Sequence, residues 1–257
     1  MYLVLGEDDD WLCGSVRETL ERRGQEVRII PDIFGRSATI AWRIETERSS
    51  SRFVLEDGTV LSDEQISAVL VRRPRFSARQ DWKAEDEVYI YAEKEAALLG
   101  WIWTLRCPVI NRYPAELWFE PAPPPLFWSR QLAACGLQCA GSDLMQAGHS
   151  HAEGSGLGKS YSAAVVASHV VWDQKVAIND IETRLVQFAK TIGLACVKCE
   201  FTTAAGSPQL TVVETFPTFE EFSSISRAEI VERIADLMIG SSSSTDGNEN
   251  LDRSLWS

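Results

Sequence analysis

The stretch Ala195–Phe216, ACVKCEFTTAAGSPQLTVVETF, decides the fold more than any other part of this chain. Two runs with strand-forming residues flank the small-residue segment AAGSP, which is the pattern of a β-hairpin. If the hairpin turns symmetrically there, the expected cross-strand pairs are Thr203 with Gln209, Glu200 with Val212 and Lys198 with Glu214. Because side chains alternate along a strand, Lys198, Glu200 and Glu214 then share one face of the sheet.

The rest of the chain alternates between strand and helix patterns. Residues 2–6, 11–24 and 26–30 read as strand, helix and strand, so the chain opens as a βαβ unit. Further strands are predicted at 39–45, at 52–61 with a turn at Asp57-Gly58, and at 66–71, 108–111, 141–145 and 161–173. Further helices are predicted at 88–105, at 126–136, from an N-cap at Asp180 to Gly193, and from a capping box at Ser226 and Glu229 to Gly240.

These patterns predict an α/β protein with two units. We expect residues 1–120 to form an α/β unit around a parallel sheet, and residues 121–240 to form a smaller α+β unit. The polar residues 241–257 lack apolar periodicity, so we predict a disordered tail.

Composition narrows the class of function. The chain has 257 residues and a net charge of −12, which disfavours nucleic-acid binding because phosphate contacts need a basic face. No apolar run approaches the about 18 residues of a membrane span, and the first residues lack the pattern of a signal peptide. Six cysteines without a secretion signal are typical of reduced thiols. We therefore expect a cytoplasmic protein whose partners are neither nucleic acid nor membrane.

The segment Gly154–Ser160, GSGLGKS, resembles a nucleotide-binding P-loop at first sight. The motif G-x-x-x-x-G-K-[ST] requires a glycine where this chain has Glu153, and Gly154 is one residue too close. The residues after Ser160 are strand-like, so no helix N-terminus would face a phosphate. We predict a surface connection here instead of a phosphate site.

The order of several segments resembles a known family. VLVRRPRF (69–76) and CPVINRYPAELW (107–118) resemble the pre-ATP-grasp domain of the graspetide, or microviridin-type, peptide ligases. SRQLAACGL (129–137) resembles the opening helix of their ATP-grasp part, and YSAAVVASHVVW (161–172) resembles its central strand pair. Residues 188–219 resemble the block that gathers the metal-binding acids. The resemblance implies a pre-ATP-grasp-like parallel-sheet unit followed by a truncated ATP-grasp-like α+β unit.

The chain departs from this family in the region of the nucleotide lid. A full ATP-grasp enzyme has a small α+β lid with phosphate-binding lysines between the two central strand segments. Only residues 144–160 lie between the corresponding segments here, whereas even one βαβ unit takes roughly 30 residues. The lid is therefore expected to be missing, and a nucleotide would lose one of its two walls.

The metal motif also departs from the family pattern, which is an acid on one hairpin strand and Glu-x-Asn on the next. Glu200 and Glu214 stand at the acid positions, but Phe216 stands at the asparagine position. Mg²⁺ bound with ATP prefers carboxylate and phosphate oxygens. Lys198 beside these carboxylates supplies the positive charge that the metal would have supplied. We therefore favour a cross-strand salt bridge over a metal site at Glu200 and Glu214.

Four arginines follow the predicted strand at 66–71, on a chain that is acidic as a whole. They are Arg72, Arg73, Arg75 and Arg79. One interpretation is an anion or acidic-peptide site, because arginine forks match carboxylates and open α/β sheets bind ligands at strand ends. The alternative, which we favour, is pairing with acids of the same chain, such as those at residues 7–10.

Two other groups of residues have side chains of metal-ligating types. His149 and His151 would lie on one side of an extended segment, where Glu153 could join them on a zinc ion, but a polar loop is the favoured interpretation. His169, the third histidine, lies further along. The remaining candidates are the pairs Cys135 with Cys139 and Cys196 with Cys199. The second pair points to opposite faces of a strand, so we predict buried thiols.

The sequence leaves two hypotheses for function. The first is a non-catalytic, pseudoenzyme-type binding or accessory protein with an ATP-grasp-like fold and no cofactor, which acts in peptide natural-product modification. Its partner would be a peptide or a full-length ATP-grasp ligase. The alternative is a minimal ATP-dependent carboxylate–amine (peptide) ligase that uses Mg-ATP and completes its site across a homodimer. The missing lid and Phe216 favour the first hypothesis, and retention of Glu200 and Glu214 keeps the second open.

Overall fold

The computed structural model contains two compact units, which are described separately. The first unit contains Met1–Arg112 and the part of the last helix that begins at Ala235, and the second contains Tyr113–Ile234. The described residues are 1–34, 38–44, 49–72, 83–119, 123–139, 145–146, 160–174, 180–204 and 207–242. Within these ranges, no helix combines the length and the apolar character needed to cross a membrane.

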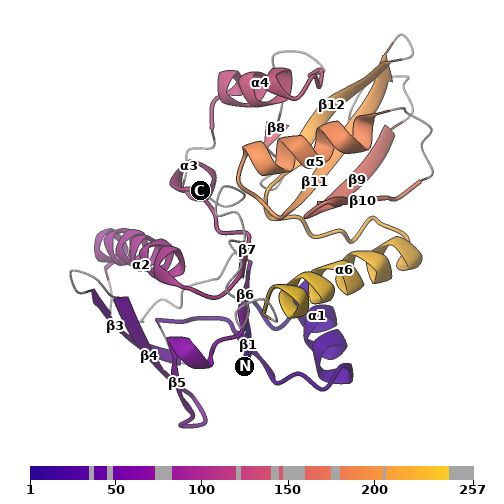
Figure 1. The fold of residues 1–257 in the computed structure, drawn as a ribbon. Coiled ribbons are helices and arrows are strands. Elements are labelled where there is room, and N and C mark those ends of the chain that lie inside the picture. Colours follow the sequence, from indigo (N-terminus) through magenta and orange to yellow (C-terminus); the bar gives the residue numbers. More distant parts are fainter. Residues whose placement is uncertain are drawn as a thin grey trace. The chain divides into compact units, whose positions relative to one another are not determined.

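A four-stranded parallel sheet forms the centre of the first unit (Figure 1). Its strands, in spatial order, are β2 (Val27–Ile30), β1 (Tyr2–Leu5), β6 (Ala68–Val71) and β7 (Val109–Ile110). Every residue of β1 and β6 is buried, which explains their unbroken apolar sequences. Two helices, α1 (Trp11–Arg22) and α2 (Ala84–Thr104), lie on opposite sides of this sheet (Figure 1). The chain therefore opens with the predicted βαβ unit.

An antiparallel sheet is inserted between β2 and β6 in the chain. Its strands are β3 (Ala38–Ile44), β4 (Ser49–Leu55) and β5 (Val60–Ser62), and the short 3₁₀-helix η1 (Asp63–Gln65) follows. The β4–β5 hairpin turns at Gly58, whose φ of 81° is easily reached only by glycine. Trp101 of α2 donates a hydrogen bond from Nε1 to Ser51 Oγ on β4 at 2.9 Å. The ring of Trp101 meets Phe53 edge to face at 4.9 Å, so α2 is docked on this sheet.

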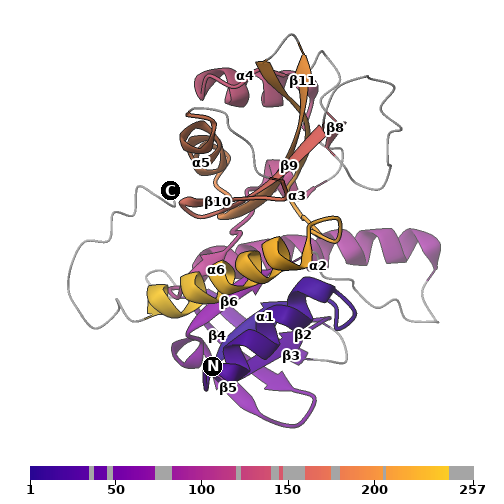
Figure 2. The same cartoon turned by 90° about the vertical axis from the view of Figure 1, so that its right-hand side faces the viewer.

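The second unit is built on a five-stranded sheet. Its strands, in spatial order, are β10 (His169–Trp172), β9 (Ser160–Val166), β11 (Cys196–Ala204), β12 (Ser207–Glu214) and β8 (Met145–Gln146). Its helices are α3 (Ala115–Trp118), α4 (Pro125–Ala134), α5 (Ile181–Thr191) and the first part of α6 (Ser224–Ser242). Figures 1 and 2 show α4 and α5 on the same side of this sheet, where the apolar face of α5 is buried.

One predicted helix start is wrong, and another is confirmed. α6 begins at Ser224, because Ser223 Oγ accepts a hydrogen bond from the backbone N–H of Ser226 at 3.2 Å and so caps the helix. The predicted cap, Ser226, lies inside the helix, and α6 continues past Gly240 to Ser242. Asp180 is the N-cap residue of α5, as predicted; its backbone is left-handed with φ 61°, and its side chain makes no capping hydrogen bond.

Candidate functional site

The β11–β12 hairpin brings three of the predicted charged residues together. Lys198 lies opposite Glu214, and Glu200 lies opposite Val212, as the symmetric turn predicts. Lys198 Nζ contacts the carboxylate of Glu200 at 2.9 Å and that of Glu214 at 2.6 Å. The cross-strand salt bridge favoured by the sequence pattern is therefore present in the structure.

The register changes only on the turn side of these residues. The predicted pair of Thr203 with Gln209 is wrong, because Gln209 lies opposite Thr202. A β-bulge after Glu200 causes the shift and leaves Thr211 without a partner residue on β11. The hydroxyl of Thr211 donates to the backbone carbonyl of Glu200 at 3.1 Å, which fixes the bulge beside the charged residues.

A third carboxylate, from Glu221, completes the cluster. Glu221 lies in the segment between β12 and α6, and its carboxylate also pairs with Lys198 Nζ. The turn that carries it is closed by a hydrogen bond from Phe222 N to the carbonyl of Phe219 at 3.1 Å. Phe219 is fully buried and has a left-handed φ of 59°, which is rare for a bulky side chain. Sequence reasoning missed Glu221, because nothing in the pattern TFPTFEEF predicts which way this turn folds.

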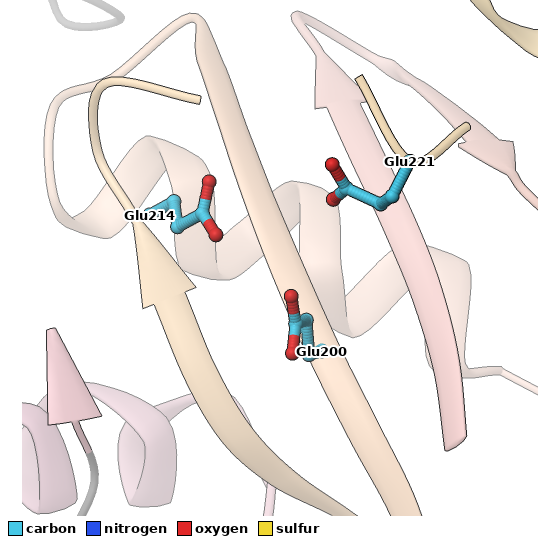
Figure 3. A group of neighbouring side chains, drawn as sticks. All are labelled: Glu200, Glu214 and Glu221. Atoms are coloured by element: carbon cyan, nitrogen blue, oxygen red, sulfur yellow. The ribbon is translucent and has the colours of Figure 1, made fainter. Parts of the chain in front are cut away.

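We call Lys198, Glu200, Glu214 and Glu221 the lysine–carboxylate cluster. Figure 3 shows its three carboxylates directed toward a common centre, and their oxygens lie within 4.8 Å of one another. Lys198 is 4 % exposed and Glu214 is 15 % exposed, whereas Glu221 reaches solvent at 40 %. Among the described residues, this is the one group of three or more acids, histidines or cysteines close enough to hold a cation.

Burial and pairing act in opposite directions on the charges of this cluster. Burial alone would lower the pKa of Lys198, but hydrogen bonds to Glu214, Glu221 and Glu200 outweigh it and raise that pKa well above its ordinary value of 10.5. Burial raises the pKa of Glu214, and the contact with Lys198 offsets part of this effect. Lys198 is therefore a permanent cation at neutral pH.

An aromatic cluster lies directly after the end of β12. Phe216 stacks on Tyr113 with a centroid distance of 4.2 Å and meets Trp118 edge to face at 5.6 Å. The hydroxyl of Tyr113 donates to the carbonyl of Thr215 at 2.6 Å, which holds the backbone between Glu214 and Phe216. Phe216 is thus a packing residue that supports one end of the lysine–carboxylate cluster.

No family model matches the chain, and no curated protein matches its sequence. Solved structures do match. The PsnB ligase complexed with minimal precursor, Mg and ADP aligns with a TM-score of 0.72 and 16 % identity, over 94 % of this chain and 98 % of that one. The chain has an ATP-grasp-like fold.

Two further structures support the same fold. The macrocyclase MdnC from Microcystis aeruginosa MRC, bound with precursor peptide MdnA, aligns with a TM-score of 0.69 and 13 % identity, over 94 % of this chain and 100 % of that one. A RiPP-associated ATP-grasp ligase from Chryseobacterium gregarium, in complex with ADP and a leader and core peptide, aligns with a TM-score of 0.71 and 10 % identity. The second alignment covers 93 % of this chain and 96 % of that one. The predicted resemblance to graspetide-type ligases is confirmed at the level of the fold.

An ATP-grasp-like fold implies a Mg²⁺-nucleotide site, and the residues of the lysine–carboxylate cluster do not fit one. Mg²⁺ needs near-octahedral oxygen coordination at about 2.1 Å. The centre between the carboxylates holds the buried ammonium of Lys198, which contacts Glu200 and Glu214 at hydrogen-bond distance. A metal ion at that centre would meet a like charge, and the stacked ring of Phe216 offers no oxygen ligand.

A short connection joins β8 to β9. β8 ends at Gln146 and β9 begins at Ser160, so residues 147–159 join them. The P-loop-like segment and the candidate zinc residues His149, His151 and Glu153 lie in this connection, outside the described residues. Ser160 itself opens a strand, in agreement with the argument against a P-loop.

Arg72 is described, whereas Arg73, Arg75 and Arg79 lie outside the described residues. Arg72 follows β6 and is only 6 % exposed; its Nε and Nη2 donate to Asp10 Oδ2 at 2.9 and 2.8 Å. Asp10 also accepts the backbone N–H of Leu12 at 2.8 Å and caps α1. A side chain on Gly6 would come within 2.9 Å of Arg72 Cβ, so backbone and guanidinium stem are closely packed at this strand end.

The remaining described candidates are not among the ligating groups of the cluster, although Cys199 stands between Lys198 and Glu200 on β11. His169 is exposed at the start of β10. All six cysteines are free thiols, and Cys196 and Cys199 are both buried on β11, in agreement with their predicted role as packing residues. Burial raises the pKa of Cys199 strongly, so its thiol is neutral at physiological pH.

Proposed function

We propose that this chain is a non-catalytic binding or accessory protein of peptide modification, built on an ATP-grasp-like fold. The observation that carries this proposal is the position of Lys198 Nζ, within 2.9 Å of Glu200 and 2.6 Å of Glu214. A protein that hydrolyses Mg-ATP, or transfers its phosphate, needs the position between these carboxylates for the metal ion. The short connection of residues 147–159 supports the same conclusion, because it leaves no room for a second wall around a nucleotide.

Peptide modification is proposed as the context because relatives with this fold are ligases solved with precursor peptides. MdnC is described with its precursor peptide MdnA, and PsnB with a minimal precursor. We propose that this chain binds an acidic peptide, or a full-length ATP-grasp ligase that handles one. The basic segment Arg72–Arg79 is the proposed contact, with Arg73, Arg75 and Arg79 as the peptide-binding side chains and Arg72 as their anchor through Asp10.

Isothermal titration calorimetry with Mg-ATP tests the non-catalytic part of the proposal. We expect no heat of binding from the wild-type chain at micromolar concentrations, with a catalytically competent ATP-grasp ligase as the positive control. Micromolar binding of Mg-ATP that disappears in Glu214→Ala would overturn it. In that case the chain would be a minimal ATP-dependent carboxylate–amine ligase, an alternative that the retained carboxylates of Glu200 and Glu214 favour.

Fluorescence anisotropy tests the peptide-binding part independently. A labelled glutamate-rich peptide is the probe, and a lysine-rich peptide of equal length is the control for non-specific association. We expect the triple variant Arg73→Ala, Arg75→Ala and Arg79→Ala to weaken binding of the acidic probe at least tenfold, whereas the exposed Lys190→Ala should leave it unchanged. Equal affinity of the triple variant and the wild type would reject this surface.

A further inference from the structure

The lysine–carboxylate cluster matches the bonding capacity of its ammonium group. A lysine ammonium has three N–H donors and no acceptor. The structure gives it three carboxylate partners, one each from Glu200, Glu214 and Glu221. The group that replaces the metal of the fold is therefore fully satisfied by the chain itself.

Position in the sheet keeps this ammonium in place. Lys198 lies on β11, which pairs with β9 on one side and with β12 on the other. Its side chain is 4 % exposed, so leaving the cluster would expose both the apolar stem of the lysine and two partly buried carboxylates, those of Glu200 and Glu214. An external cation competing for these oxygens must first displace a covalently tethered one.

We infer that Lys198 is the resident cation of this cluster and excludes divalent metal ions from it, so that loss of the lysine charge would convert the three glutamates into a metal site. This inference deepens the proposed function, since it names what keeps the site metal-free. The observation behind it is that one ammonium group lies among three carboxylates whose oxygens are within 4.8 Å of one another.

The chemistry predicts which ion would enter the site. Three carboxylates without a buried ammonium repel one another, and a hard divalent ion relieves that repulsion through oxygen ligands. Mg²⁺ demands near-ideal octahedral geometry, whereas Ca²⁺ accepts a flexible one, and Mn²⁺ also prefers carboxylate and water oxygens. Glu221 is the ligand that distinguishes this site from the two-acid pattern in the sequence, because it comes from the turn after β12.

The test is Lys198→Met, which keeps much of the apolar stem and removes the charge. Mn²⁺ alone, without nucleotide, is titrated into the variant and the wild type by calorimetry, and the melting temperature is followed in EDTA and in Mn²⁺. We expect the variant to bind Mn²⁺ on the order of tenfold or more tighter than the wild type and to melt higher in Mn²⁺ than in EDTA. The exposed Lys190→Met on α5 is the matched control and should behave as the wild type does.

Two further variants make the result specific. Adding Glu221→Gln to Lys198→Met should remove most of the gained affinity, because it removes one of three charged ligands. The wild type with Glu221→Gln alone should show no Mn²⁺ binding. Equal Mn²⁺ affinity in the wild type and Lys198→Met would overturn the inference, as would a gain that survives the loss of Glu221.

The inference also stays testable if Lys198→Met does not fold. The wild-type ammonium of Lys198 can be followed by NMR of its ¹⁵N-labelled Nζ group during addition of Mn²⁺ or diamagnetic Ca²⁺. We expect the Lys198 signal to be unchanged in Ca²⁺. A shift that saturates with Ca²⁺ and is absent in Glu214→Gln would show that a metal enters beside the lysine, and the inference would be wrong. Because no nucleotide is present, this outcome is distinct from a positive Mg-ATP titration of the proposed function.

Discussion

Replacing Phe216 with asparagine introduces the residue type that the resemblance to graspetide-type ligases implies at this position, and the structure predicts that the change lowers stability. Phe216 makes two ring contacts, with Tyr113 at 4.2 Å and Trp118 at 5.6 Å. Aromatic pairs contribute about 0.5–1.5 kcal/mol each beyond area burial. The ring is half-buried, so exchange for a polar amide loses about 1 kcal/mol more of apolar burial. We expect Phe216→Asn to lower the free energy of unfolding by about 2–4 kcal/mol.

Urea denaturation followed by tryptophan fluorescence measures this loss, because Trp118 lies in the same cluster. Phe216→Leu is the control: it keeps an apolar side chain and should lose only about 1–2 kcal/mol. Destabilisation by Phe216→Asn of less than about 0.5 kcal/mol would refute the packing role of the ring. We further expect no Mg-ATP binding in Phe216→Asn, because Lys198 still occupies the centre of the carboxylates. Binding gained by this single change would refute the reasoning about Lys198.

Three other predictions follow from named contacts. Asp10→Asn keeps the cap on α1 but loses the ion pair to the buried Arg72, whereas Asp10→Ala loses both contacts. In urea denaturation we expect both variants to have a lower free energy of unfolding than the wild type. The value for Asp10→Ala should be about 1 kcal/mol below that for Asp10→Asn. The pKa of Lys198 is raised in the folded state, so its contribution is complete below its ordinary value of 10.5 and is lost as the pH rises above it. The stability advantage of the wild type over Lys198→Met should therefore shrink in melts above pH 10.5, and a constant difference would contradict the ion pairing. Burial raises the pKa of Cys13 to about 12 and that of Cys199 further, so iodoacetamide at pH 8 followed by mass spectrometry should leave both unmodified in the folded chain. Rapid alkylation of Cys199 would mean that β11 opens.

The sequence predicted the part of the site that depends on strand pairing, which is the position of Lys198 opposite Glu214. Period-2 alternation and a symmetric turn were enough to place Lys198 opposite Glu214, because both lie in strands with uninterrupted register at that end. The pairing near the turn was wrong, because a β-bulge shifts it by one residue, and bulges have no clear sequence signal beyond glycine or a local irregularity. Thr211, the extra residue, is an ordinary strand former.

Glu221 could not be predicted, because its position depends on tertiary structure. It follows β12 in a segment without periodicity, and its approach to Lys198 depends on a left-handed backbone at Phe219. A glycine or asparagine there would have indicated a turn of this kind, whereas phenylalanine indicates a strand or a core position. The predicted start of α6 at Ser226 is wrong for a related reason. Ser223 and Ser226 both have capping chemistry, and only the local backbone decides between them.

The last helix has a consequence for how this protein is made. α6 ends in the first unit, where Arg23 binds Asp236 at 2.8 Å and where Ala235 and Met238 are fully buried. The last turns of α6 lie beside α1 in both views (Figures 1 and 2). During synthesis, the first 112 residues leave the ribosome long before the helix that completes their core, so the first unit cannot complete its packing until α6 has also been made. A stop codon that removes the residues from Ala235 onward would therefore damage the N-terminal half of the protein, although every residue of β1 to β7 would still be present.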